Sequence, residues 1–306
     1  MANSRATLLL LIFVAGLSQR AAESLGQQPD PKQVLAIVNG REIKEGDLAF
    51  LYLSRRIPND QRESLKPRFL EILIEQHLMR EFLQSRKATP SQNELDAQVA
   101  LVLKVIRDAG DEPDEQLSKL GMTRESLREE LALPLTWKSY LRLLVTNESL
   151  RQYFEKHRPQ FDGTQLRVSQ IFLNLPKESD PAAETQAEKR LLNLKLQIES
   201  GELSFEEAAK LHSESPSKST GGDTGWITYR GKLPQALCEA AFALKDQELT
   251  APIRSPFGWH VLQVTERKPG ELSLEDVRAV VFNQLSQELW QETVKAQKAK
   301  AIIEIR

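Results

Sequence analysis

Hydrophobic residues recur at intervals of three and four through the first half of the chain, which is the spacing of amphipathic helices. The pattern begins after Lys44, and its clearest members are Leu48, Leu51, Tyr52, Phe69, Leu70, Leu73, Ile74, Leu78 and Phe82. Further helices are predicted at 91–109, 113–120, 123–144 and 147–157. Before them, an apolar run at 34–38 followed by Asn39-Gly40 predicts a short strand and a tight turn. This half is therefore predicted to be helical after one strand.

A different pattern begins near residue 163. Residues 165–175 alternate between apolar and polar and are rich in β-forming side chains, so they predict a strand. A charged amphipathic helix is predicted at 182–199, and Ser204 with Glu207 has the capping-box spacing of a second helix start. The remaining predictions are a strand at 226–228, a helix at 234–243, and strands at about 250–254 and 259–266. One sheet with helices on one face is the simplest packing for this set.

A glycine-rich turn lies between these elements, in the sequence Gly221-Gly222-Asp223-Thr224-Gly225-Trp226. Three glycines within five residues are unfavourable in a helix and are typical of a turn that needs positive φ. The chain ends with a predicted helix at 274–300, whose apolar stripe is followed by Ile302 to Ile305.

The first 22 residues are predicted to be a cleaved secretory signal peptide. Arg5 precedes an apolar run of 11 residues, Thr7 to Leu17, which is too short to span a bilayer. An uncleaved signal would instead act as a membrane tether, and a buried helix of the mature protein is a further alternative. Residues 19–31 are polar and resemble a linker. We expect an exported protein of the periplasm or cell envelope.

Composition excludes several classes of function. The chain has 306 residues with 40% hydrophobic content, enough for two domains. Its formal net charge of -2 argues against nucleic-acid binding by a broad basic surface. Cys238 is the single cysteine, and the four histidines lack the close spacing of a helical metal pair. We therefore expect no metal and no small-molecule cofactor.

Residues 163–268 resemble the parvulin-type (PpiC, rotamase) peptidyl-prolyl isomerases. The resemblance rests on five segments in the right order: Val168 to Phe172, Phe205 to Ala209, Gly221 to Trp226, Ala241 to Leu244, and Phe257 to His260. The flanking arrangement is similar to the SurA and PrsA group of exported chaperone-isomerases. That resemblance implies an α+β chain: an all-helical N-terminal chaperone-like domain (32–160) completed by the C-terminal helix (271–306), plus a parvulin domain with a four-stranded antiparallel sheet and helices (163–268). We infer that 302–305 pairs as a strand with 35–38.

The resemblance also implies the catalytic residues, His260, Gln170 and Ser215. His260 matches the second of two histidines that face each other in the family, and Gln170 stands at the place of the first. Glutamine can donate and accept a hydrogen bond as neutral imidazole can. Ser215 stands where Asp or Cys is usual, although a shift of one residue would place Glu214 there, and Ser215-Pro216 has an equally good interpretation as a simple turn.

Apolar residues that would hold the proline ring follow from the same resemblance: Leu233, Leu237, Ile227 and Phe257. Without it, leucines at this spacing predict core packing. Thr224 is a polar departure from the family pattern, and Cys238 is expected to be a small buried residue.

The predicted function is a peptidyl-prolyl cis-trans isomerase that assists the folding of exported polypeptides by twisting X-Pro bonds in an apolar pocket. The alternative is a holdase chaperone whose parvulin domain binds peptides but is catalytically weakened or inactive. A cell-envelope scaffold has no specific support in the sequence.

Overall fold

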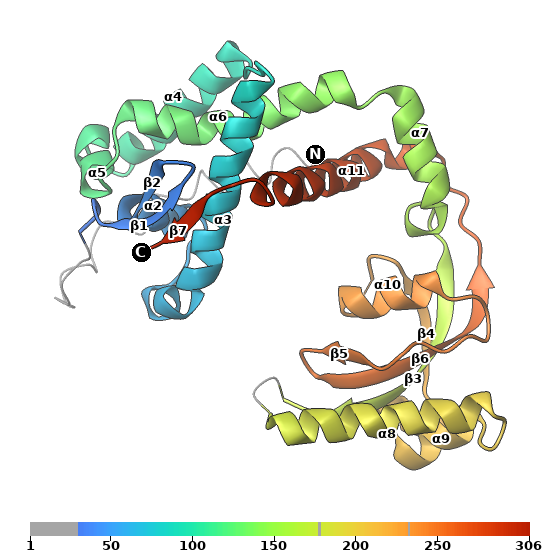
Figure 1. The fold of residues 1–306 in the computed structure, drawn as a ribbon. Helices are drawn as coiled ribbons and strands as arrows, with labels where there is room; N and C mark the ends of the chain where they lie inside the picture. The colour runs from blue at the N-terminus through green and yellow to red at the C-terminus, as the bar shows by residue number, and fades with distance from the viewer. Residues whose placement is uncertain (1–29, 177–178, 232) are drawn as a thin grey trace. The chain divides into compact units, whose positions relative to one another are not determined.

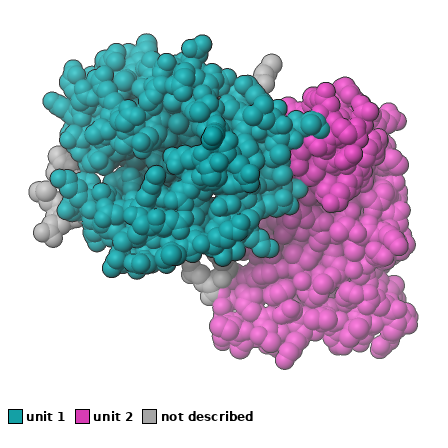
Figure 2. Space-filling view, turned by 45° about the horizontal axis from the view of Figure 1, so that its top comes forward, with its two compact units in different colours: residues 1–146, 286–306 teal, residues 147–285 magenta. Residues whose placement is uncertain are grey.

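The computed structural model describes residues 30–176, 179–231 and 233–306, so the predicted signal peptide lies outside the described residues. The chain divides into two compact units, coloured separately in Figure 2. Unit 1 comprises residues 1–146 and 286–306, and unit 2 comprises residues 147–285. The predicted domain limits at residues 160, 163, 268 and 271 stay a prediction. None of the described helices is both long and apolar enough to cross a membrane.

The two ends of the chain meet in a small antiparallel sheet in unit 1. Its strands are β1 (Val34–Val38), β2 (Arg41–Lys44) and β7 (Ile303–Ile305), in the order β2-β1-β7. Ala36 pairs with Ile305 and Val38 with Ile303, which confirms the predicted pairing of the C-terminal strand. The sequence predicted a single strand before the helices; this was incomplete, because the Asn39-Gly40 turn is followed by β2, which pairs with β1 as a hairpin.

From residue 30 to residue 146, the described part of unit 1 contains the helices α2 (Glu45–Ser54), α3 (Asn59–Ser85), α4 (Gln92–Asp108), α5 (Pro113–Lys119) and α6 (Arg124–Leu144) (Figure 1). Ser91 and Thr123 cap α4 and α6 by accepting backbone N–H bonds with their hydroxyl oxygens. One apolar cluster joins β1, β2, α2 and α3, and a second joins α4, α5 and α6. The helices predicted at 91–109, 113–120 and 123–144 are therefore confirmed. α4, α5 and α6 begin and end within one residue of the predicted bounds.

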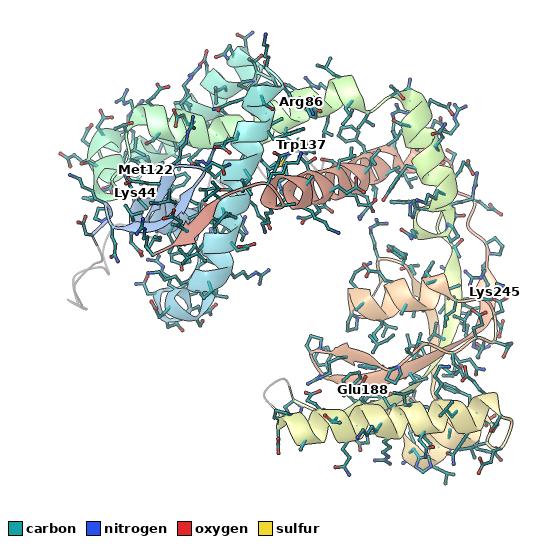
Figure 3. The ribbon with its side chains drawn as sticks, in the orientation of Figure 1. Lys44, Arg86, Met122, Trp137, Glu188 and Lys245 are labelled. Atoms are coloured by element: carbon teal, nitrogen blue, oxygen red, sulfur yellow. The ribbon has the colours of Figure 1, made fainter. Side chains whose placement is uncertain are left out.

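The last long helix, α11 (Leu274–Lys298), begins in unit 2 and ends in unit 1. In unit 1, Trp137 of α6 lies beside α11 (Figure 3). The Trp290 ring of α11 packs edge to face on it, with ring centroids 5.4 Å apart. The Trp137 indole N–H also donates to Ser286 Oγ at 3.1 Å. This contact attaches the C-terminal half of α11 to the helices of unit 1.

Unit 2 is built on a four-stranded antiparallel sheet in the order β4-β3-β6-β5. The strands are β3 (Gln165–Asn174), β4 (Asp223–Thr228), β5 (Ile253–Ser255) and β6 (Gly258–Lys268). The helices are α7 (Asn147–Lys156), α8 (Pro181–Glu199), α9 (Phe205–His212) and α10 (Gln235–Ala243), with 3-10 turns η1 (Arg158–Gln160) and η2 (Pro216–Thr220). The predicted α+β fold with a four-stranded antiparallel sheet is therefore confirmed.

Helices cover both faces of this sheet, which corrects the prediction of helices on one face. Leu166 and Val168 of β3 pack with Leu237 and Ala241 of α10. Ile171 and Leu173 of the same strand belong to a cluster with α8 and α9 on the opposite side (Figure 1), whose other members are Leu191, Leu194, Phe205, Ala208, Ala209 and Val261. The central strands are apolar on both sides because each side is buried.

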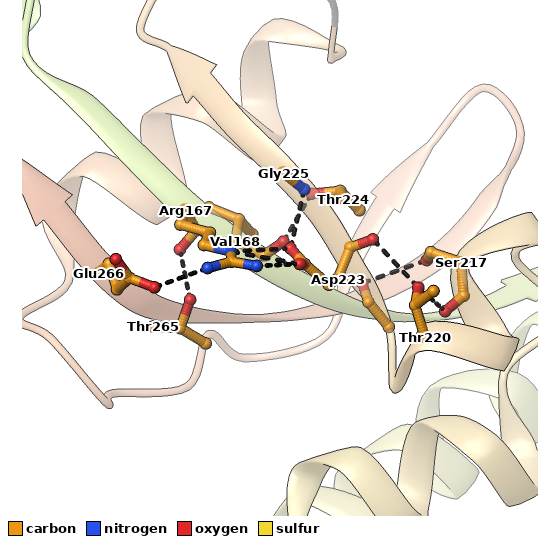
Figure 4. Close-up of polar contacts among 10 residues, drawn as sticks. Arg167, Val168, Ser217, Thr220, Asp223, Thr224, Gly225, Thr265 and Glu266 are labelled. Atoms are coloured by element: carbon orange, nitrogen blue, oxygen red, sulfur yellow. Dashed lines mark hydrogen bonds and ion pairs between the residues drawn. The ribbon is translucent and has the colours of Figure 1, made fainter.

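The glycine turn is fixed by an ion-pair cluster on β3 (Figure 4). Arg167 Nη2 donates to Asp223 Oδ2 at 2.7 Å, and Nη1 donates to Glu266 Oε1 at 2.8 Å. Asp223 Oδ1 accepts the Gly225 N–H at 2.9 Å, and the hydrogen bond from Arg167 is the main reason that the pKa of Asp223 is lowered. Asp223 therefore has a structural role in joining the turn to the centre of the sheet.

We expect Gly222→Ala to destabilise unit 2 more than Gly225→Ala does. Both glycines have positive φ, 88° and 78°, so each alanine costs about 1 kcal/mol in backbone strain. A β-carbon at Gly222 would also lie 2.6 Å from Gln170 O, whereas one at Gly225 would meet no atom within 4 Å. The total for Gly222→Ala should be about 3 kcal/mol, measured by urea unfolding. Equal losses in the two variants would contradict the close approach to Gln170.

Candidate functional site

A continuous chain of side-chain hydrogen bonds crosses the α10 face of the sheet. Gln170 of β3 and His260 of β6 lie on neighbouring strands, since Gln170 pairs with Leu262 and Phe172 with His260. His260 Nδ1 lies 3.2 Å from Gln170 Oε1, and Gln170 Nε2 donates to Ser215 Oγ at 2.9 Å. The three polar residues that the sequence singled out are therefore in direct contact.

The chain continues beyond these residues at both ends. On one side, His260 Nε2 lies 2.8 Å from Ser255 Oγ, which accepts the Phe257 N–H at 3.1 Å. On the other, Ser215 Oγ lies 3.0 Å from Ser217 Oγ, whose hydroxyl donates to Gly222 O at 3.1 Å. The site is thereby linked to the β5–β6 turn and to the glycine turn.

The glutamine amide fixes the tautomer of His260. Because Gln170 uses its NH2 group to reach Ser215, its carbonyl oxygen faces His260 and can only accept. His260 Nδ1 therefore carries the proton, and Nε2 accepts from the Ser255 hydroxyl. The hydrogen bonds then all run in one direction, from Ser255 through His260 and Gln170 to Ser215. None of the buried side-chain atoms of these residues lacks a partner.

The loop before η2 places Ser215, and not Glu214, against Gln170. Ser213 has no exposed surface, and its hydroxyl oxygen accepts the N–H groups of Phe172 and Ser215 at 3.1 and 3.2 Å. Ser215 is 5% exposed and accepts the Ser217 N–H, so it caps the 3-10 turn. The exposed Glu214 carboxylate accepts the Asn174 N–H at 2.7 Å. Ser215 is thus both a turn residue and part of the hydrogen-bond chain.

Burial keeps His260 neutral. The side chain is 5% exposed, and desolvation, with a smaller contribution from the nearby Arg254 guanidinium, lowers its pKa from 6.5 to about 4. The Phe172 ring lies 4.6 Å from the imidazole. The chain of hydrogen bonds is therefore uncharged at neutral pH and offers no ready proton donor or strong base.

The predicted apolar residues have unequal access to a ligand. Leu237 has no exposed surface and Ile227 is 7% exposed, so both lie in the core cluster between the sheet and α10. Leu233 is half-buried against the same cluster. Phe257, at the β5–β6 turn, is 63% exposed. Surface for a ligand is thus supplied by Leu233 and Phe257 more than by the other two.

Ser255, Arg254 and Glu184 lie near His260 and were not singled out from the sequence. Ser255 accepts and donates in the hydrogen-bond chain, as described above. Arg254 Nη2 donates to Glu184 Oε1 at 2.7 Å and Trp259 Nε1 to Glu184 Oε2 at 2.7 Å, which attaches the β5–β6 hairpin to α8. The available signal for Ser255 was the tight hairpin between β5 and β6. Ile253 pairs with His260 and Ser255 with Gly258, so Ser255 lies diagonal to His260 on the same face.

Other predicted features have structural roles here. Thr224 Oγ1 donates to Val168 O at 2.6 Å, so the hydroxyl supports the backbone of β3. Cys238 is buried with no exposed surface, as expected, and burial raises the pKa of its thiol. In the described part of the chain, no group of three His, Cys, Asp or Glu side chains is arranged to hold a metal ion.

We expect the His260 imidazole to titrate near pH 4, which NMR of the histidine ring protons as a function of pH can measure. Because the pKa of His260 is lower in the folded state than in the unfolded state, the unfolded state takes up a proton first as the pH decreases. The contribution of His260 to the unfolding free energy is therefore fully present above pH 6.5 and is lost as the pH decreases toward 4. This group alone should remove up to about 3 kcal/mol of unfolding free energy over that range. His260→Asn should lack this part of the loss, and an imidazole that titrates near 6.5 would contradict the assignment.

Comparison with known proteins agrees with the fold. Residues 171–266 match the rotamase family, described as the PPIC-type PPIASE domain. Chaperone SurA of Nitrosospira multiformis is 38% identical over 136 residues, which are 43% of this chain and 30% of that protein. Chaperone SurA of Thiobacillus denitrificans is 38% identical over 147 residues, 47% of this chain and 33% of that protein. The chain thus matches about a third of the length of these relatives.

Among solved structures, peptidylprolyl isomerase PrsA from Bacillus anthracis covers 76% of this chain and 96% of its own, with 20% identity and a TM-score of 0.42. The family match includes β3 from Ile171 onward, the glycine turn and β6 as far as Glu266, and so contains His260 and Ser215. Residues 171–266 therefore match a rotamase domain of the PPIC type, as the parvulin motifs predicted, in a chain similar to the SurA chaperones.

Proposed function

We propose that the protein is a peptidyl-prolyl cis-trans isomerase that assists the folding of exported polypeptides. The observation that carries this proposal is the uncharged hydrogen-bond chain through Ser215, Gln170, His260 and Ser255 inside a PPIC-type domain. A glutamine stands in place of the first histidine, and every residue of the hydrogen-bond chain still has a partner on each side. The replacement therefore preserves the hydrogen bonding that the resemblance implies for the two histidines.

The reaction needs no charged catalyst. Rotation of an X-Pro bond faces a barrier of about 18–20 kcal/mol and takes tens to hundreds of seconds unaided. The twisted amide has lost its resonance and is less dipolar than either planar form, so an apolar environment favours it over the planar ground states. A site whose polar groups all pair with one another leaves the amide in such an environment.

The residues then have separate roles. Leu233 and Phe257 would contact the proline ring, with Leu237 and Ile227 as the packed support beneath them. Gln170, His260 and Ser215 would act mainly as positioning residues, since they hold β3, β6 and the loop before η2 in register. Ser255 extends the same role to the turn that carries Phe257.

The substrates would be X-Pro bonds in unfolded or partly folded exported chains, in the periplasm or cell envelope. The predicted signal at 1–22 would direct export, and an uncleaved signal would tether the protein to the membrane. Neither nucleic acid nor a cofactor has a part in this proposal.

One observation favours the alternative of a peptide-binding holdase. Because Leu237 and Ile227 lie in the core, the surface for a proline ring is small, whereas Phe257 and Trp226 remain 63% and 45% exposed. Exposed aromatic side chains can bind apolar segments of unfolded chains without catalysing rotation. The holdase and the isomerase are distinguished by turnover, since both would suppress aggregation.

We expect Gln170→Leu to lower the acceleration of cis-trans exchange by about 10- to 100-fold, because it leaves His260 Nδ1 without an acceptor and removes the donor that Gln170 supplies to Ser215 Oγ. Exchange of a proline tetrapeptide, followed by NMR, measures the effect. Gln170→His is the matched control: imidazole can also accept from His260 and donate to Ser215, so it should retain activity.

His260→Ala should lose the acceleration together with Gln170→Leu. If the folded wild-type protein does not accelerate exchange, the isomerase proposal fails for that substrate, and suppression of aggregation would then support the holdase. If Gln170→Leu is as active as the wild type, the hydrogen-bond chain has no part in the activity.

A further inference from the structure

A groove of about 320 Å³ lies in unit 1, outside the rotamase domain. It is lined by residues of α2, α3, α6 and α11: Asp47, Phe50, Leu51, Ser54, Leu73, Gln76, Glu130, Leu131, Leu133, Pro134, Trp137 and Trp290. Its volume is at the lower end of the range for ligand sites in proteins. Nothing in the proposed isomerase activity uses it.

The walls of the groove are mostly apolar and aromatic. Trp137 and Trp290 pack edge to face on one another, and Leu51, Leu73 and Leu131 are buried beside them. The Trp137 indole N–H is already bound to Ser286 Oγ, and the Ser54 hydroxyl donates to Leu51 O. These two donors are thus occupied inside the protein.

The charged groups in the lining are both acceptors. Asp47 and Glu130 bring two carboxylates to the groove, and the buried Gln76 Oε1 has no hydrogen-bond partner among the described residues. No lysine, arginine or histidine is found among the lining residues of the part described. Arg80 Nη2, outside the lining, lies 2.6 Å from Glu130 Oε2 and balances one of the two charges. The groove therefore has a net negative charge and unused acceptor capacity.

We propose that this groove binds the side chain of a lysine or arginine in an extended polypeptide. The methylene stem would lie along Trp137 and Trp290, and the cationic head would reach the Asp47 and Glu130 carboxylates. Lysine and arginine carry several donors and no acceptor, which complements this lining. The ammonium or guanidinium group would also interact favourably with the indole faces.

Other side chains fit the lining less well. A purely apolar side chain would cover the carboxylates without replacing their water, and an acidic side chain would meet two like charges. Burial already raises the pKa of Glu130, and the neighbouring Asp47 raises it further, although Arg80 opposes this. An arriving cation offsets the unfavourable burial of negative charge, which gives the groove its selectivity.

The test uses the full chain and three blocked proline-free peptides, Ala-Leu-Lys-Leu-Ala and its versions with norleucine or glutamate in place of lysine. Calorimetry at low salt should show the lysine peptide binding at least about tenfold more tightly than the norleucine peptide. Glu130→Gln should remove that difference. The matched control Glu129→Gln changes the charge of the exposed neighbour on α6, which does not line the groove, and should keep it.

Equal affinities for the lysine and norleucine peptides would overturn the proposal, as would equal losses in Glu130→Gln and Glu129→Gln. Because Glu130→Gln leaves Arg80 without its charged partner, unfolding curves must show that the variant is folded, and Asp47→Asn gives a second, independent loss of charge. The peptides contain no proline, so this result is separate from the isomerase test. Proline exchange should be unchanged in Glu130→Gln.

Discussion

Burial of polar groups at the centre of the unit 2 sheet is the constraint on which the candidate site depends. A buried histidine and a buried serine, joined by a half-buried glutamine, are costly unless every buried donor meets an acceptor. Here the pairing is complete only because β3, β6 and the loop before η2 hold their positions, and Gly222 allows the backbone of the turn to approach Gln170 closely. The site and the fold of the domain are therefore stabilised by the same contacts.

Much of this arrangement was predictable from the sequence. The pairing of β1 with β7 was inferred from the resemblance to the SurA and PrsA group, and the contact of Gln170 with His260 from the resemblance to the parvulin-type isomerases. The helices on both faces of the sheet were also readable, since β3 is apolar at Leu166 and Val168 and again at Ile171 and Leu173. The first pair and the second pair face opposite sides of the sheet, so both sides must be covered by other elements.

Other features depended on tertiary contacts that the sequence does not specify. Leu237 is one of three residues, with Cys238 and Ala241, that form the buried stripe of α10, and the same spacing suits a ligand contact or a core contact. Whether Ser215 or Glu214 meets Gln170 was decided by Ser213, whose buried hydroxyl anchors the loop to β3. The groove of unit 1 had no signal in the sequence, because its lining residues come from four helices and lie between residues 47 and 290 of the chain.

The glutamine at position 170 also changes what the site can do. An imidazole in that place could exchange its two tautomers, so a pair of histidines can carry the hydrogen bonds of the chain in either direction. An amide has a fixed donor and a fixed acceptor, so reversing the hydrogen-bond chain requires a half-turn of the terminal amide group, whereas an imidazole needs only to exchange its proton between nitrogens. In this protein the tautomer of His260 is consequently set by the orientation of the Gln170 amide. Such a site is well suited to a fixed, uncharged binding surface, which is what amide rotation needs, and poorly suited to moving protons.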